Sequence, residues 1–208
     1  MNYDLAAFSK KLKKHLDKER YLHTQGVMYT AAAMAMAYGL DMEKAQIAGL
    51  LHDCAKCIPN DKKLDLCRKK EIPVTEIEEQ APFLLHAKLG VYIARKKYGV
   101  DDKEILSAIR WHTTGKPEMT DLDKIIYLAD YIEPGRDRAP NLSQIRRLAF
   151  ENLDECMYEV LKSTLDYLGS NPKTLDLATK DAFNYYEELH KNHLTGNHNP
   201  SEVKEGYI

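Results

Sequence analysis

Apolar residues recur at helical spacing along almost the whole chain. Leu5, Phe8, Leu12 and Leu16, for example, follow one another every three or four residues, as they do on one face of an amphipathic helix. No run alternates apolar and polar residues between turn signals, which is the pattern of a half-buried strand. The sequence therefore predicts an all-α fold.

Capping residues, glycines and prolines divide this pattern into separate helices. Thr75 and Glu78 have capping-box spacing and predict a helix start, whereas Gly39 and Gly99 predict helix ends. After the first helix, we expect further helices over residues 21–37, 41–54, 60–69, 82–98, 101–112, 121–132, 152–168 and 172–193. Loops are expected over residues 113–119 and 135–141. No repeat or linker divides the chain, so we expect one helical-bundle domain over residues 1–194 and a polar tail over 195–208.

Charge and composition exclude two classes of partner. The 208 residues include 30 Lys and Arg and 32 Asp and Glu, and this net charge of −2 argues against a dedicated nucleic-acid binder. Residues 21–40 lack charged side chains over a membrane-spanning length. Their content, which includes His23, Gln25 and five alanines, suits a helix buried among other helices instead. We therefore expect neither nucleic acid nor a membrane as a partner.

The N-terminal residues and the cysteines both favour a cytoplasmic protein. The N-terminal residues mix charges with apolar groups and lack the apolar core of a secretory signal. Cys54 and Cys57 have the spacing of a redox pair or half a zinc site, but no second pair follows, so packing is the preferred interpretation. We expect reduced thiols at all four cysteines: Cys54, Cys57, Cys67 and Cys156.

The histidines fall into two groups when they are placed on helical faces. Four of them, together with one aspartate, lie on apolar faces and are expected to point inward: His23, His52, His86, His112 and Asp130. The others have charged neighbours or lie near the C-terminus and are expected at the surface: His15, His190, His193 and His198. One inward histidine is usually an ordinary core residue. Five buried polar groups without partners would each cost several kcal/mol, so they must satisfy one another or a shared ligand.

A shared cation would satisfy these groups together. Asp53 directly follows His52, so an imidazole and a carboxylate can approach one site from slightly different directions. Four histidines and two aspartates are more ligands than a tetrahedral zinc site uses, but they suit two six-coordinate metals bridged by a carboxylate and a hydroxide. The sequence thus predicts a dinuclear metal site in the core of the bundle.

The order of these residues resembles a known family. His23, the pair His52-Asp53, and Asp130 resemble the H…HD…D pattern of the HD-domain phosphohydrolases, and His86 and His112 between them resemble its two-metal branch. Three local strings are similar to the YqeK family, whose members hydrolyse diadenosine tetraphosphate symmetrically to two ADP with a di-iron centre: LLHDCAK at 50–56, WHTTG at 111–115 and ADYIEPGR at 129–136.

The resemblance implies a ligand set and a mechanism. It implies that one metal is held by His23, His52, Asp53 and Asp130, and a second by Asp53, His86 and His112, with Asp53 as the bridge. Two divalent ions sharing a water can produce a bridging hydroxide near neutral pH that attacks the phosphoryl group, so no protein nucleophile is required. Iron is the expected metal, and Mn, Co, Ni and Zn remain alternatives because imidazole and carboxylate ligands accept them all.

Cationic residues next to the metals are expected to bind the anionic substrate. Lys56 follows Asp53 by three residues, and Arg136 lies in the loop after Asp130, so both are candidates for phosphate binding and catalysis. Alternatively, Lys56 complements the end of its helix and Arg136 is a solvated loop charge. Thr113 and Gly115 could let the backbone approach a nucleotide, although they could also form a simple turn.

Two other functions stay open. The same metals could serve another nucleotide, such as a dNTP or a guanosine alarmone. A protein with this fold could also be a non-catalytic nucleotide sensor, although such a protein is expected to have lost metal ligands. The sequence leaves a homodimer open.

Overall fold

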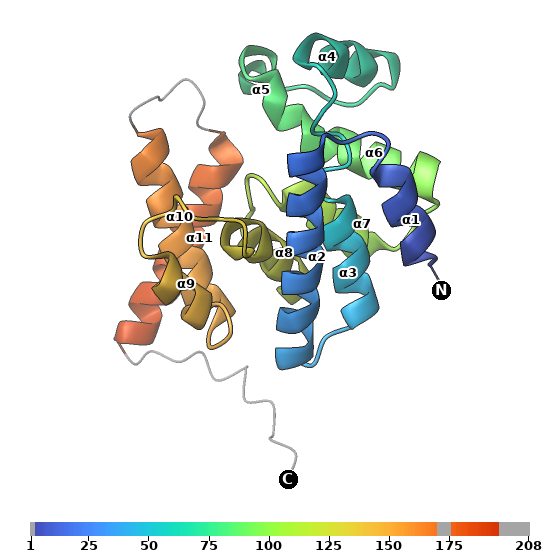
Figure 1. Ribbon diagram of the computed structural model, residues 1–208. Coiled ribbons are helices and arrows are strands. Elements are labelled where there is room, and N and C mark those ends of the chain that lie inside the picture. Colours follow the sequence, from blue (N-terminus) through green and yellow to red (C-terminus); the bar gives the residue numbers. More distant parts are fainter. Residues whose placement is uncertain (1–2, 170–175, 196–208) are drawn as a thin grey trace.

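The computed structural model describes residues 3–169 and 176–195, and every regular element in these ranges is a helix (Figure 1). The predicted all-α fold is confirmed. Among the described residues, no helix is both long and apolar enough to cross a membrane.

Two helices packed side by side form the centre of the fold: α2 (Lys18–Ala37) and α3 (Met42–Leu51). Their small residues allow close packing, because a Cβ atom added at Gly49 would lie only 2.9 Å from Cα of Met28. The side chains of Asp17 and Asp41 cap the two helices by accepting backbone N–H groups. This packing brings His23, on α2, next to His52, at the end of α3.

Three further helices complete the core: α6 (His86–Tyr98), α7 (Lys103–Trp111) and α8 (Asp121–Ile132). Helix α7 packs against α3, α6 and α8, and α8 also packs against α2. Fully buried side chains fill the space between them, among them Leu50, Leu89, Ile105, Ile109 and Ile126. These contacts bring the ends of α3 and α7 and the start of α6 to one side of the core.

The remaining helices surround this core. Helix α1 (Leu5–Leu12) packs on α3, while α4 (Asn60–Lys69), the short α5 (Glu76–Gln80) and a 3₁₀ turn (Pro82–Leu85) precede α6. Helices α10 (Leu153–Leu168) and α11 (Leu177–Leu194) pair with each other, and α10 packs against α8 (Figure 1). The short α9 (Leu142–Leu148) contacts both α8 and α10.

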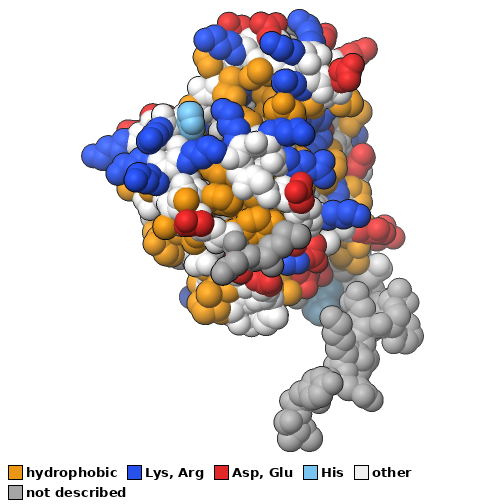
Figure 2. Space-filling view, turned by 90° about the vertical axis from the view of Figure 1, so that its right-hand side faces the viewer, with side chains coloured by type: hydrophobic (Ala, Val, Ile, Leu, Met, Phe, Trp, Pro, Cys, Tyr) orange, Lys and Arg blue, Asp and Glu red, His pale blue; other side chains and the backbone are white. Residues whose placement is uncertain are grey.

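Basic side chains are spread among apolar and acidic ones on the face over α6 (Figure 2). The last turn of α1 holds Lys10 and Lys11, and the last turn of α6 holds Arg95, Lys96 and Lys97. These cations complement the carbonyl groups at the helix C-termini. The chain is therefore nearly neutral as a whole, but the C-terminal ends of these two helices are locally basic.

Most predicted helices are confirmed, and six details differ. Helix α2 begins at Lys18 instead of Tyr21, and α3 ends at Leu51 instead of Cys54. The first helix ends at Leu12, before the buried Leu16. The helix predicted from Pro82 is a 3₁₀ turn followed by α6, and α7 is capped by Asp102 instead of Asp101. Helix α9 was not predicted. Residues 172–175 of the last predicted helix, and 196–208 of the predicted tail, lie outside the described residues.

Candidate metal centre and substrate cavity

Three of the inward histidines sit at helix ends. His52 and His112 each follow the last residue of a helix, α3 and α7 respectively, and His86 is the first residue of α6. Carbonyl groups in the last turn of a helix have no partner within the helix. The side chains of His52 and His112 can therefore bind carbonyls of a kind that is already used in the middle of a helix, whereas His86 binds a carbonyl of the 3₁₀ turn that precedes α6.

In each of these histidines, Nδ1 binds the backbone carbonyl three residues earlier. The partners are Gly49 for His52 at 2.7 Å, Phe83 for His86 at 2.6 Å, and Ile109 for His112 at 2.7 Å. A carbonyl oxygen can only accept a hydrogen bond, so the proton must lie on Nδ1. The lone pair of each neutral ring is then on Nε2, which points to the interior.

His23 is held differently, because it lies inside α2. Its Nδ1 lies 3.1 Å from Oε1 of Glu133, and its Nε2 lies 3.0 Å from Oδ1 of Asp130. Glu133 directly follows α8, the helix that carries Asp130. Helices α2 and α8 thus supply the second half of the cluster.

Asp53 lies between the four imidazoles. Its Oδ1 atom is 3.2 Å from Nε2 of His86 and 3.5 Å from Nε2 of His112. Its Oδ2 atom is 3.5 Å from Nε2 of His52 and 3.9 Å from Nε2 of His23. Each carboxylate oxygen therefore faces a different pair of histidines. All six residues that sequence analysis proposed as metal ligands come together here: His23, His52, Asp53, His86, His112 and Asp130.

The electrostatics of the cluster favour ligand protonation states. Burial alone would raise the pKa of Asp53, but its electrostatic interaction with His52 and its contacts with His112 and His86 hold it well below its ordinary value. Burial would also raise the pKa of Asp130, but its contact with His23 lowers it below the ordinary value. Burial lowers the pKa of His86 to about 4, against the attraction of Asp53. At neutral pH, the carboxylates are charged and His86 is neutral, as metal binding requires.

The donor set fits a divalent metal. Among the described residues, Nε2 of His23, Nε2 of His52 and Oδ1 of Asp53 are buried without a hydrogen-bond partner. In addition, Nε2 of His86 and Nε2 of His112 lie 3.0 Å apart, and a single hydroxyl, that of Thr113, lies within 3.1 Å of both. So many lone pairs facing one another need a cation, and nitrogen and carboxylate ligands suit first-row transition metals. Two overlapping groups in the cluster have spacing suited to an ion, namely His23–His52–Asp130 and His52–Asp53–His112.

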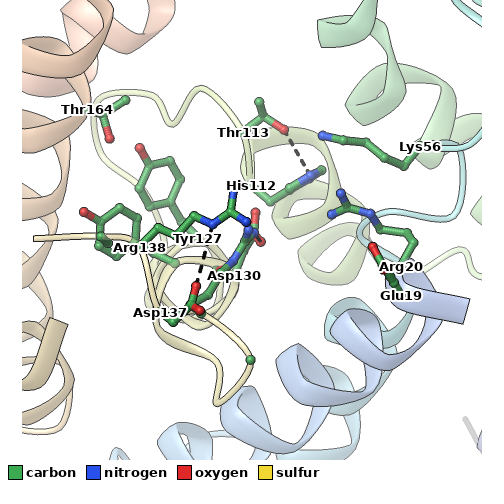
Figure 3. A pocket seen from close by; sticks show the side chains of 14 residues that line it. Glu19, Arg20, Lys56, His112, Thr113, Tyr127, Asp130, Asp137, Arg138 and Thr164 are labelled. Carbon is green, nitrogen blue, oxygen red and sulfur yellow. Dashed lines mark hydrogen bonds and ion pairs between the residues drawn. The ribbon is translucent and has the colours of Figure 1, made fainter.

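A cavity of about 680 Å³ opens onto the cluster, which is an ordinary size for a small-molecule site. His112 and Asp130 lie in its wall, and the side chains of Arg20 and Lys56 lie on one side of them (Figure 3). Tyr127 and Thr164 lie on the other side, on α8 and α10. The loop after α8 contributes Gly135, Arg136, Asp137, Arg138 and Ala139. The cavity thus combines the cluster with four cationic side chains.

Three of the four predicted substrate-binding residues line or adjoin this cavity. Lys56 is 32 % exposed, and its Nζ lies 3.9 Å from Oδ1 of Asp53. Arg136 lines the cavity, and its guanidinium forms an ion pair with Asp130. Thr113 lies in the wall, but Gly115 does not line the cavity. Gly115 has a φ of +67°, which a glycine adopts without strain, and belongs to the turn after α7.

Sequence analysis missed three residues that contact the site. Arg20 donates a hydrogen bond from Nη1 to Oδ2 of Asp53 at 2.8 Å, and its place one turn before His23 could have indicated this. Glu133 lies within the string ADYIEPGR at 129–136, but sequence analysis assigned it no role. Arg146 of α9 donates to three carbonyls at the end of α8 and in the next loop, those of Ile132, Glu133 and Arg136. Nothing in the sequence around Arg146 indicates this role.

Two predictions outside the cluster have clear outcomes. All four cysteines are free: Cys54, Cys67 and Cys156 are buried, and Cys57 is exposed. His190 was expected at the surface, but it is half-buried, lies 2.7 Å from Glu155 and stacks on Tyr158. That expectation was wrong because both partners lie on α10, a different helix.

Comparison with known proteins gives consistent results. The HD domain matches residues 20–135. The symmetrical bis(5'-nucleosyl)-tetraphosphatase of Bacillus subtilis is 40% identical over 157 residues, which cover 76% of this chain and 83% of that protein. The protein of the same name from Staphylococcus aureus is 36% identical over 176 residues, covering 84% and 90% of the two chains. A crystal structure from Clostridium acetobutylicum, described as an HD superfamily hydrolase involved in NAD metabolism, has a TM-score of 0.86 and 36% identity, covering 91% of this chain and 100% of that one.

Proposed function

Because this chain belongs to the HD domain family, we propose that it is a metal-dependent hydrolase that cleaves diadenosine tetraphosphate symmetrically to two ADP. Its relatives named as symmetrical bis(5'-nucleosyl)-tetraphosphatases confirm the resemblance to the YqeK type of HD domain. The observation that carries the proposal is the position of Asp53. Its two oxygens face different histidine pairs beside a cavity lined with cations.

HD-domain membership implies binding of divalent metal, and we propose two ions, with iron as the native metal. The proposed ligands are His23, His52, Asp53 and Asp130 for one ion and Asp53, His86 and His112 for the other. Ions held there would activate water for in-line attack and offset charge on the phosphoryl oxygens.

The cationic side chains of the cavity would bind the phosphate chain. Lys56 and Arg136 lie on different sides of the cluster, so they can neutralise phosphates on both sides of the bond that breaks. Arg136 offers a planar guanidinium that can hold phosphate bidentately, and Lys56 offers a point charge. Thr113 supplies a hydroxyl beside His86 and His112. We propose a cytoplasmic location, which the four free thiols support.

Product analysis tests this proposal. Purified protein loaded anaerobically with Fe²⁺ should convert diadenosine tetraphosphate to ADP alone. AMP plus ATP as products, or no turnover, would refute it. A panel with NAD, a dNTP and a guanosine alarmone would reveal a different nucleotide substrate, and binding without turnover would indicate a sensor.

A matched pair of variants makes the test specific. His112→Ala should lower kcat/KM by about 100-fold or more, since several kcal/mol of charge stabilisation depend on the metal. His15→Ala removes an exposed histidine outside the cluster and should leave kcat/KM unchanged. Equal losses in both variants would contradict a role for the cluster.

A further inference from the structure

His23 differs from the other three histidines of the cluster in how its Nδ1 is held. The others use a carbonyl in the last turn of a helix or in the 3₁₀ turn before α6, whereas His23 is the sixth residue of α2, where backbone carbonyls already bind within the helix. Its Nδ1 partner is the carboxylate of Glu133, which lies 110 residues further along the chain. Among the four histidines, His23 alone has a carboxylate, and not a backbone carbonyl, as the partner of its Nδ1.

Glu133 is buried at a place where a carboxylate needs strong compensation. The residue is 4% exposed, and its Oε2 accepts a 2.6 Å hydrogen bond from the backbone N–H of Gly135. Its Oε1 faces His23 Nδ1 at 3.1 Å and lies 3.9 Å from Nε of Arg136. Burying a charge is costly unless it is paired and hydrogen-bonded, and these three contacts meet that requirement. Each of these contacts is made to a residue of the metal cluster or to a residue of the loop after α8 that lines the cavity.

Helix α2 leaves space for this carboxylate. Gly26 lies one turn after His23, and a Cβ atom added there would come within 2.5 Å of Oε2 and 3.2 Å of Cδ of Glu133. No side chain fits at position 26 unless the Glu133 carboxylate moves. The chain therefore accommodates Glu133 independently from both sides, by a turn after α8 and by a glycine on α2.

We propose that Glu133 is a positioning residue that holds His23 with its proton on Nδ1 and its Nε2 directed at Asp130, and that couples this geometry to the loop carrying Arg136. The inference rests on the proposed metal centre. A carboxylate behind an imidazole fixes its orientation and makes its free nitrogen a stronger metal ligand. The same residue is bound through its backbone by Arg136, whose N–H donates to the carbonyl of Glu133 at 2.9 Å. A shift of Glu133 would thus disturb a metal ligand and a phosphate-binding residue together.

The first test uses metal-free protein, so that it does not depend on the proposed activity. Imidazole ¹⁵N NMR should find Nδ1 of His23 protonated in the wild type, whereas in Glu133→Ala the proton should move to Nε2, which faces Asp130. Glu133→Gln should keep the wild-type tautomer, because the amide oxygen can still accept from Nδ1. Glu78→Ala is the matched control, since Glu78 is also 4% exposed but pairs with Lys88, and it should leave the His23 tautomer unchanged.

The second test measures binding of Mn²⁺ alone by calorimetry. Glu133→Ala should weaken binding by about 10- to 100-fold, as is typical when the partner of a metal-bound histidine is lost. Gly26→Ala should do the same while leaving Glu133 present, because its methyl group displaces the carboxylate. Glu133→Gln should restore most of the affinity, and Glu78→Ala should match the wild type.

The two tests separate the inference from the proposed function. A wild type that binds no divalent metal would refute the proposed function, while the tautomer measurement would still decide the role of Glu133. If Glu133→Ala and Gly26→Ala both keep the wild-type tautomer and Mn²⁺ affinity, the inference is wrong. If Glu133→Ala does not fold, Gly26→Ala and Glu133→Gln give the decision.

Discussion

The Oδ1 atom of Asp53 lies 3.2 Å from Nε2 of His86, whereas its Oδ2 atom faces His23 and His52. A carboxylate turned in this way can bridge two ions, whereas Asp130 groups with His23 and His52 alone. We therefore expect Asp53→Ala to lower bound metal below one ion per chain, and Asp130→Ala to remove only one of the two ions. Metal analysis after anaerobic loading and desalting measures both. Asp53→Ala protein that keeps two ions would contradict the bridging role.

Two lysines lie near proposed ligands, and replacing them should change different properties: the activity for Lys56 and the stability for Lys88. Lys56 lines the cavity, so Lys56→Met should lower kcat/KM by about 100-fold, the effect of losing one donor to a developing charge, with little change in stability. Lys88 follows His86 by two residues but forms a 2.6 Å ion pair with the buried Glu78. Lys88→Met should cost about 3 kcal/mol of unfolding free energy by leaving that charge unpaired, with kcat/KM unchanged.

Steady-state kinetics and urea unfolding of both lysine variants distinguish these outcomes. The contrast serves as an internal control, because each variant is the reference for the other. A loss of kcat/KM in Lys88→Met equal to that in Lys56→Met would mean that the kinetic effect is only a consequence of lower stability.

The parts of the fold that follow from local signals were predictable. Helices α8 and α4 were both predicted with their observed bounds, and the structure shows that Thr120 and Asp123 form a capping box at the start of α8. Helix α9 was missed because it has only seven residues, so its three apolar positions, Leu142, Ile145 and Leu148, are too few to form a recognisable periodic pattern. Short helices held by tertiary contacts lack the periodic pattern on which such predictions depend.

The same distinction applies to the site. Five of the six proposed ligands were identifiable because each was placed on an apolar helical face, which is a local property, and Asp53 was identifiable because it directly follows His52. Arg20 and Glu133 were missed because their importance lies in contacts with Asp53 and His23, which are 33 and 110 residues away in sequence. Side-chain orientation across packed helices cannot be deduced from spacing within one helix.

Arg146 should affect substrate binding without contacting substrate. Its guanidinium donates to the carbonyls of Ile132, Glu133 and Arg136 at 2.9–3.0 Å and so holds the loop in place. A lysine cannot make three directed bonds of this kind, so Arg146→Lys should raise KM for diadenosine tetraphosphate by about 10-fold, the scale of one or two lost hydrogen bonds. Bound metal should stay at the wild-type level. Kinetics with metal analysis checks this, and an unchanged KM would contradict it.

The stability of the metal-free protein should depend on pH through His86. Its folded-state pKa of about 4 lies below the ordinary value of 6.5, so between these values the unfolded chain binds more protons and stability falls as the pH falls. The loss should approach about 3 kcal/mol, at roughly 1.4 kcal/mol for each unit of pKa shift. Urea unfolding from pH 6.5 to 4 measures it. His86→Gln should reduce the slope and His15→Gln should not. An equal slope in the wild type and His86→Gln would show that other groups carry the dependence. Asp53 and Asp130 contribute little over most of this range, because their lowered pKa values affect stability only as the pH approaches the ordinary aspartate value of 3.8.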